Sequence, residues 1–177
     1  MRIIDSKPVH LMTGPAKNPE DDTRMVHDFM SDPSAKTIVC GGTSATIVSR
    51  VLGKRLDVSL DYVDPEIPPI AYMEGVDLVT EGVLTLNRVV QLLRRYAKNE
   101  TVSETFFEEL DKNNGASMVA KILIEDCTEV HLYVGKAINS AYQNPGLPFD
   151  LGIRQNLVEQ LKGVIEEIGK KVVVTYY

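Results

Sequence analysis

The sequence predicts a three-layer α/β domain built on a mostly parallel, Rossmann-like sheet. Short apolar runs rich in β-branched residues alternate along the chain with longer segments whose apolar residues recur at every third or fourth position. Strands that alternate with helices pair in parallel through right-handed crossovers. We therefore expect a sheet of about five strands in the order 3-2-1-4-5, with helices on both faces.

The clearest unit is the stretch KTIVCGGTSATIVSRVLG, residues 36–53. Its apolar run at 37–40 suits a strand buried on both faces, and Gly41-Gly42 end that strand. A helix follows, which Thr43 or Ser44 can cap. A strand, a glycine turn and a helix start together present backbone N–H groups and positive dipole, so this unit suits an anion.

The other elements follow from the same signals. Further strands are expected at 9–12, 56–62, 130–134 and 172–174, of which 56–62 alternates apolar and polar residues as an edge strand does. Proline at three positions makes 63–72 an extended connector. Helices are expected at 18–30, 43–52 and 78–98, at a short segment after Ser103, near 118–123 and at 150–168. Glu74, Asp77 and Glu81 are interpreted as acids at the positive end of the longest helix, 78–98.

Length and charge limit the function classes. The chain has 177 residues, which suits one domain with a sizeable core. Its formal net charge of −6 argues against a nucleic-acid surface and against anionic lipid. The apolar runs are shorter than the roughly 20 residues that a spanning helix needs, and residues 1–5 do not resemble a signal peptide. We expect no membrane partner, no nucleic-acid partner and a cytoplasmic location.

The residues that could carry redox or metal chemistry are few and scattered. Cys40 and Cys127 each lie beside an expected strand, where a buried thiol is favoured over a disulfide. His10, His27 and His131 show no spacing typical of metal ligands. The sequence therefore predicts no metal site and no catalytic residue in this chain.

Four stretches in this order carry a resemblance to a known family: GGTSATIVSRVLG from Gly41, YVDPEIPPI from Tyr62, GVDLVTEGVLTL from Gly75, and GKAINSAYQNPGLPFDLGIRQNLVEQL from Gly135. Together they resemble the segment that follows the catalytic domain in bacterial serine/threonine phosphatases similar to stage II sporulation protein E, of the metal-dependent protein phosphatase 2C superfamily. The resemblance extends over about residues 9–177.

The resemblance implies that residues 1–8 are a remnant of a preceding phosphatase domain or a linker, and that residues 9–177 are a single α/β domain. It implies a covalently linked phosphatase domain as partner, with manganese or magnesium as the cofactor of that parent enzyme and none in this chain. The separated Asp-Gly and Gly-Asp motifs that hold those ions are absent here. Asp21-Asp22 is interpreted as dipole capping rather than as a remnant of a metal site.

Ligands of open parallel sheets bind at the carboxyl ends of the strands, where the strand order reverses. With the expected order, this crevice lies between the first and fourth strands. Its candidate contacts are small or polar residues that follow three strands, suited to a small anion: Thr13, Gly14, Gly41, Gly42, Thr43, Ser44, Gly135, Asn139 and Asn144. The alternative is that the glycines only make tight turns and that Thr43 or Ser44 is only a cap.

Three functions stay open at this stage. The leading hypothesis is a non-catalytic regulatory or ligand-sensing C-terminal domain of a bacterial serine/threonine phosphatase. The alternatives are a small enzyme acting on a phosphorylated or nucleotide substrate, and a module that makes the phosphatase a homodimer. The turn Gly41–Ser44 matches neither the Walker P-loop nor the GxGxxG pattern, so it names no nucleotide.

Overall fold

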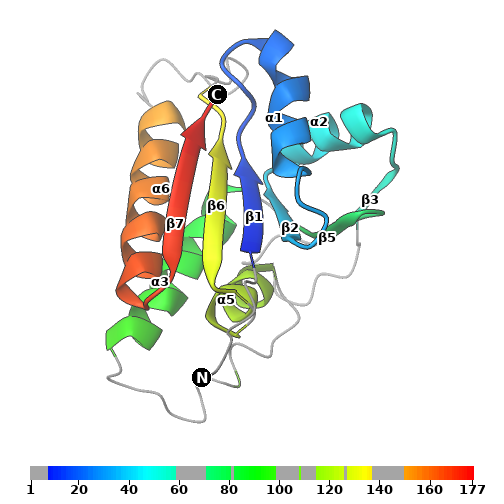
Figure 1. Cartoon of the computed structure of the whole chain (residues 1–177). Coiled ribbons are helices and arrows are strands. Elements are labelled where there is room, and N and C mark those ends of the chain that lie inside the picture. The colour runs from blue at the N-terminus through cyan, green and yellow to red at the C-terminus, as the bar shows by residue number, and fades with distance from the viewer. Residues whose placement is uncertain are drawn as a thin grey trace.

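A computed structural model of the chain describes residues 8–58, 71–80, 82–98, 108, 115–125, 127–136 and 150–177. The fold is a three-layer, Rossmann-like α/β arrangement with one seven-stranded sheet in the order β3-β4-β5-β2-β1-β6-β7 (Figure 1). The strands are β1 (Pro8–Thr13), β2 (Lys36–Cys40), β3 (Leu56–Val58), β4 (Ala71–Met73), β5 (Val76–Thr80), β6 (Glu129–Val134) and β7 (Lys171–Tyr176). The helices are α1 (Asp22–Phe29), α2 (Gly42–Leu52), α3 (Val83–Lys98), α5 (Gly115–Glu125) and α6 (Asp150–Glu167), with a 3-10 turn at Pro19–Asp21 before α1.

The sheet is parallel from β5 through β2, β1 and β6 to β7, and only β4 runs antiparallel to its neighbours. The central strands carry apolar side chains on both sides, as strands covered on both faces do. Helices α1 and α2 cover one face, where Val26 and Val48 pack with Met12 and Val39. Helices α3, α5 and α6 cover the other face, where Leu93 packs with Leu11 and Ile38.

The expected fold class is confirmed, and the expected strand order is correct in part. The sequence order 2-1-4-5 corresponds to β2-β1-β6-β7, and β3 is at an edge as expected. The structure corrects the middle of the chain, because residues 71–73 and 76–80 form β4 and β5 rather than a connector and the start of a helix. The longest expected helix begins only at Val83, so Asp77 lies in a strand and Glu74 in the turn before it.

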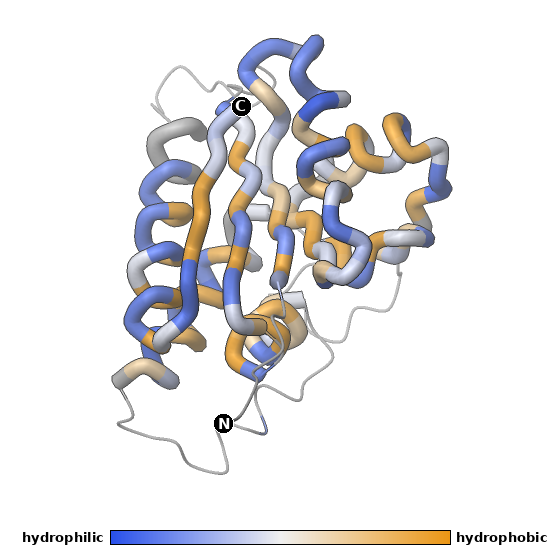
Figure 2. Tube along the Cα trace, viewed as in Figure 1, coloured by the Kyte–Doolittle hydropathy of each residue, from blue (hydrophilic) through white to orange (hydrophobic). Residues whose placement is uncertain are grey.

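Hydropathy follows this layering. Figure 2 shows hydrophobic residues along the strands and on the helix sides that face them, with hydrophilic residues on the outer side of α6. Cys40 and Cys127 are buried thiols that form no disulfide, as the sequence predicted. Within the described part of the chain, no helix has both the length and the apolar character to cross a membrane. The short helix expected after Ser103 and the polar loop at 137–148 fall outside the described residues, apart from residue 108, which is helical.

Candidate functional site

Two places in this sheet meet the topological condition for a ligand crevice. The chain leaves β1 and β2 toward the face covered by α1 and α2, whereas it leaves β5 and β6 toward the opposite face. Neighbouring strands therefore send their connections to opposite faces between β1 and β6 and again between β2 and β5. Such switch points are where open α/β sheets bind ligands. The sequence predicted the first, and missed the second because β5 was interpreted as helix.

The β1/β6 switch point is filled by the backbone of the chain. A Cβ placed on Gly135 would lie 1.9 Å from the carbonyl oxygen of Pro15 and 2.4 Å from that of Gly14. The N–H of Gly135 donates to the carbonyl oxygen of Thr13 at 2.9 Å. Thr13, Gly14 and Gly135 are thus brought together, but they contact each other directly.

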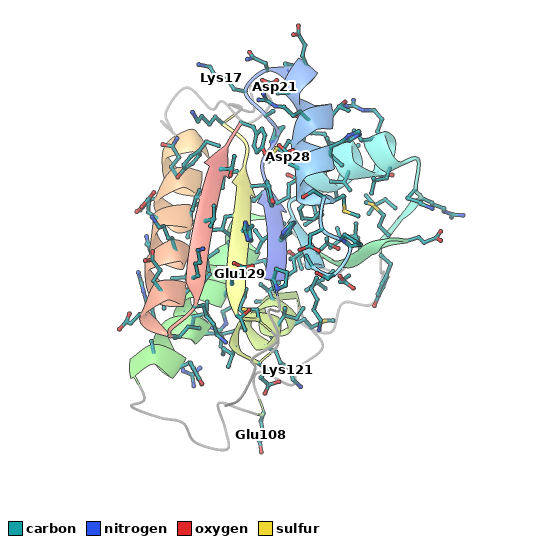
Figure 3. The ribbon with its side chains drawn as sticks, in the orientation of Figure 1. Lys17, Asp21, Asp28, Glu108, Lys121 and Glu129 are labelled. Atoms are coloured by element: carbon teal, nitrogen blue, oxygen red, sulfur yellow. The ribbon has the colours of Figure 1, made fainter. Side chains whose placement is uncertain are left out.

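Tyr177 occupies the mouth of the same crevice. Its backbone oxygen accepts hydrogen bonds from the N–H of Lys17 at 3.1 Å and from that of Lys136 at 2.8 Å. Lys17, labelled in Figure 3, follows β1, and Lys136 follows β6, so Tyr177 joins the two loops. Asn139 and Asn144, also expected here, lie outside the described residues. Ligand contacts at this crevice therefore stay a prediction.

The β2/β5 switch point is built differently, because the starts of two helices meet there. Gly41 has φ +127° and is the N-cap of α2, and its N–H donates to the carbonyl oxygen of Thr80 at the end of β5. Gly82 stands at the same place before α3, since its carbonyl accepts the first helical bond from Leu86. A Cβ on Gly82 would lie 3.4 Å from the Cα of Gly41. The two turns are therefore in contact, and both helix N-termini lie at one switch point.

Ser44 supplies the polar side chain of this site. It lies in the first turn of α2 and is only 1% exposed, yet its hydroxyl has no hydrogen-bond partner among the described residues. A Cβ placed on Gly41 would lie 3.4 Å from the Oγ of Ser44, so this oxygen lies on the glycine side of the turn. The N–H groups of Gly42, Thr43 and Ser44 have no acceptor within their own helix. The turn Gly41–Ser44 thus combines backbone donors with a buried hydroxyl.

Other hydroxyl groups surround the turn. The Oγ1 of Thr80 donates to the Sγ of Cys40 at 3.3 Å, and Thr85, three residues after Gly82, is 2% exposed. Gly115 begins α5 against this cluster, where a Cβ would lie 2.9 Å from a methyl carbon of Thr80. These residues were missed at the sequence level. The signal for them is a repeated spacing, since Gly41 precedes Ser44 by three positions and Gly82 precedes Thr85 by three.

The chemistry available at the β2/β5 switch point is binding. Its described residues offer backbone N–H groups, hydroxyls and the buried thiol of Cys40, and none of them is a carboxylate or an imidazole that could act as a general base. Across the described ranges, no group of three His, Cys, Asp or Glu side chains is arranged to hold a metal ion. Asp22 has a structural role, because its Oδ1 accepts the N–H of Ala16 at 2.9 Å.

Comparison with known proteins adds the fold alone. The sequence matches no family model and no curated protein. One solved structure that it is similar to is the phenylacrylic acid decarboxylase from Aquifex aeolicus, with 13% sequence identity, 96% of this chain and 81% of that chain covered, and a TM-score of 0.31. The class that the fold defines is therefore a doubly wound, Rossmann-like α/β protein, and a likeness of this size assigns it no activity.

Proposed function

We propose that this chain is a ligand-binding domain that holds a small anion at the β2/β5 switch point, through the turn Gly41–Ser44. The buried hydroxyl of Ser44 is the observation that carries the proposal. A buried hydroxyl without a partner costs about 1–3 kcal/mol, and a bound acceptor would remove that cost. The positive end of α2 favours negative charge at the same place.

The wider role is a regulatory one. We infer from the four stretches that resemble stage II sporulation protein E-like phosphatases that the domain serves as a non-catalytic, ligand-sensing C-terminal segment of such an enzyme. The lack of a general base among the described residues of the site supports sensing over catalysis. The sequence encoded upstream of Met1 tests this role. A phosphatase domain with metal-binding aspartates there supports the regulatory role, and an unrelated upstream sequence removes it.

A matched set of variants tests the site. Isothermal titration with inorganic phosphate, formate and common nucleotides is expected to show binding of at least one anion to the wild type. Ser44→Ala should weaken that binding about tenfold, because a hydrogen bond to a charged group is lost. Thr46→Ala is the control, since Thr46 is exposed on the same helix. Gly42→Val should also block binding while the fold, followed by circular dichroism, is kept.

The enzyme alternative is separated by an assay on the same protein. A small enzyme acting on phosphorylated substrates would release phosphate from phosphopeptides or nucleotides, with or without manganese. Robust turnover by the pure chain, lost in Ser44→Ala, would replace the regulatory proposal by the enzyme. Failure of every anion to bind the wild type would remove the site itself and leave Gly41–Ser44 as a helix cap.

A homodimer has one specific observation in its favour. Strand β7 is an edge strand, and Val173 on it is 36% exposed. Unpaired edge strands are templates for pairing with another chain. Light scattering at high protein concentration tests this reading, and a monomer under those conditions argues against it.

A further inference from the structure

The donors at the β2/β5 switch point limit the charge that a ligand can bring. The segments that form it are Cys40–Ala45, Thr80, Gly82–Leu86 and Gly115–Ser117, and their sequences contain no Lys, Arg or His. The residue between Thr80 and Gly82 is an acid, Glu81. Positive charge therefore comes from helix ends, each of which supplies about half an elementary charge.

Cations near these segments in sequence have partners elsewhere. The guanidinium of Arg50 lies 3.9 Å from Asp22, and the ammonium of Lys54 lies 3.7 Å from Glu74. Asp22 begins α1 and Glu74 lies in the β4–β5 turn, so both pairs direct these cations away from the start of α2. The charge at the switch point is thus set by α2 and α3, which together supply about one positive charge.

We propose that the ligand is a singly charged carboxylate and that a phosphate dianion is excluded; this rests on the anion site proposed above. One negative charge matches the two helix ends. A second charge would have to lose its hydration without an Arg or Lys to replace it, which is costly in a buried site. Phosphate recognition normally adds such a cation through charge-assisted hydrogen bonds.

The acceptor geometry of a carboxylate also fits the donors. A carboxylate has two oxygens, and the turn offers two kinds of donor side by side, backbone N–H groups and the hydroxyl of Ser44. The contact between Gly41 and Gly82 closes the floor between the two turns. A flat, small head group therefore needs less room than a tetrahedral one.

The experiment compares formate with methyl phosphate by NMR titration, following the backbone amide signals of residues 41–45. Methyl phosphate is a monoanion at pH 5 and a dianion at pH 8, since the second pKa of a phosphate monoester is about 6. Formate stays singly charged at both values and controls for changes in the protein. We expect formate to bind equally at both pH values, and methyl phosphate to bind at least tenfold more weakly at pH 8 than at pH 5.

The outcomes separate this inference from the proposed function. Equal or tighter binding of methyl phosphate at pH 8 overturns the carboxylate inference and leaves the anion site in place. Absence of any shift at residues 41–45 with both ligands overturns the anion site as well. Ser44→Ala should weaken formate binding about tenfold while Thr46→Ala leaves it unchanged, and equal affinities in the two variants would also overturn the inference.

Discussion

The hydroxyl of Tyr177 donates a hydrogen bond to the Oδ2 of Asp28 across 149 residues of sequence, with 2.5 Å between the oxygens. Asp28, labelled in Figure 3, projects from α1, while Tyr177 follows β7. The guanidinium carbon of Arg24 lies 5.5 Å from the centre of the Tyr177 ring, and the ring of Tyr133 stacks on its other neighbours at 6.4 Å between centroids. This contact fastens α1 to the end of the sheet beside the β1/β6 switch point.

Replacing Tyr177 by Phe should lower the free energy of unfolding at neutral pH by about 1 kcal/mol, because a hydrogen bond to a carboxylate is lost. Burial, and then the hydrogen bond to Asp28, raise the pKa of Tyr177 above its usual 10. The neutral hydroxyl is thus favoured in the folded state, and its stabilisation is present below pH 10 and lost as the pH rises further. Urea unfolding from pH 7 to pH 11 should show a smaller loss in Tyr177→Phe than in the wild type.

The control for this variant is Tyr72→Phe, because Tyr72 is 61% exposed. It should follow the wild-type profile over the whole pH range. If Tyr177→Phe does so too, the contact with Asp28 does not contribute to the alkaline stability of the fold.

Gly135→Ala should unfold the protein or destabilise it by about 3 kcal/mol or more. Its Cβ would lie 1.9 Å from the carbonyl oxygen of Pro15, which is backbone and cannot rotate away. Gly163→Ala is the matched control, since Gly163 lies in α6 with nothing within 4 Å of the added Cβ. That substitution should stabilise the protein by about 0.5–1 kcal/mol. Thermal unfolding of both variants measures the difference, and similar effects at the two positions would contradict the close contact at Gly135.

The parts of the fold that could be predicted from sequence are those where local and tertiary signals agree. Residues 37–53 show a β-branched strand, a glycine turn and a helix with a left-handed C-cap, and all three are observed, with φ +66° at Gly53. The Gly41–Ser44 turn was recognised on the same grounds. What the sequence could not show is that Ser44 is buried without a described partner, because that depends on the packing of Gly82 against Gly41.

The middle of the chain was misassigned for a specific reason. Leu78, Val79 and Val83 fit a helical spacing with Leu86, although Leu78 and Val79 belong to β5 and the others follow it. Strand β5 is short, and its antiparallel partner β4 is joined to it by a tight turn with Gly75 at φ +89°. The pairing of β5 with β2 is a long-range choice that periodicity does not contain. With β5 missed, the second switch point was missed as well.

Asp77 and Thr37 tie the starts of β5 and β2 together, and their coupling should be measurable. The Oδ2 of Asp77 accepts the N–H of Thr37 at 2.8 Å and its hydroxyl at 3.3 Å, while the N–H of Asp77 donates to the Thr37 hydroxyl at 3.1 Å. Asp77→Ala should cost about 1 kcal/mol of stability. A double-mutant cycle with Thr37→Val should give a coupling energy of about 0.5–1 kcal/mol. Additive effects would show that these bonds do not hold in solution.

Lys170 should stabilise the C-terminal end of α5. Its ammonium donates to the carbonyl oxygen of Cys127 at 2.6 Å and to that of Ile124 at 3.3 Å. The last carbonyls of a helix have no acceptor role within it and lie at its negative end, so a cation there satisfies both the hydrogen bonds and the dipole. Lys170→Met should therefore lower the free energy of unfolding by about 1 kcal/mol. Lys171→Met, one residue on and exposed at the start of β7, removes the same charge without these contacts and should change stability by less than about 0.5 kcal/mol. Urea unfolding of the two variants gives the comparison, and equal losses would mean that the net charge, rather than the capping of α5, accounts for the effect.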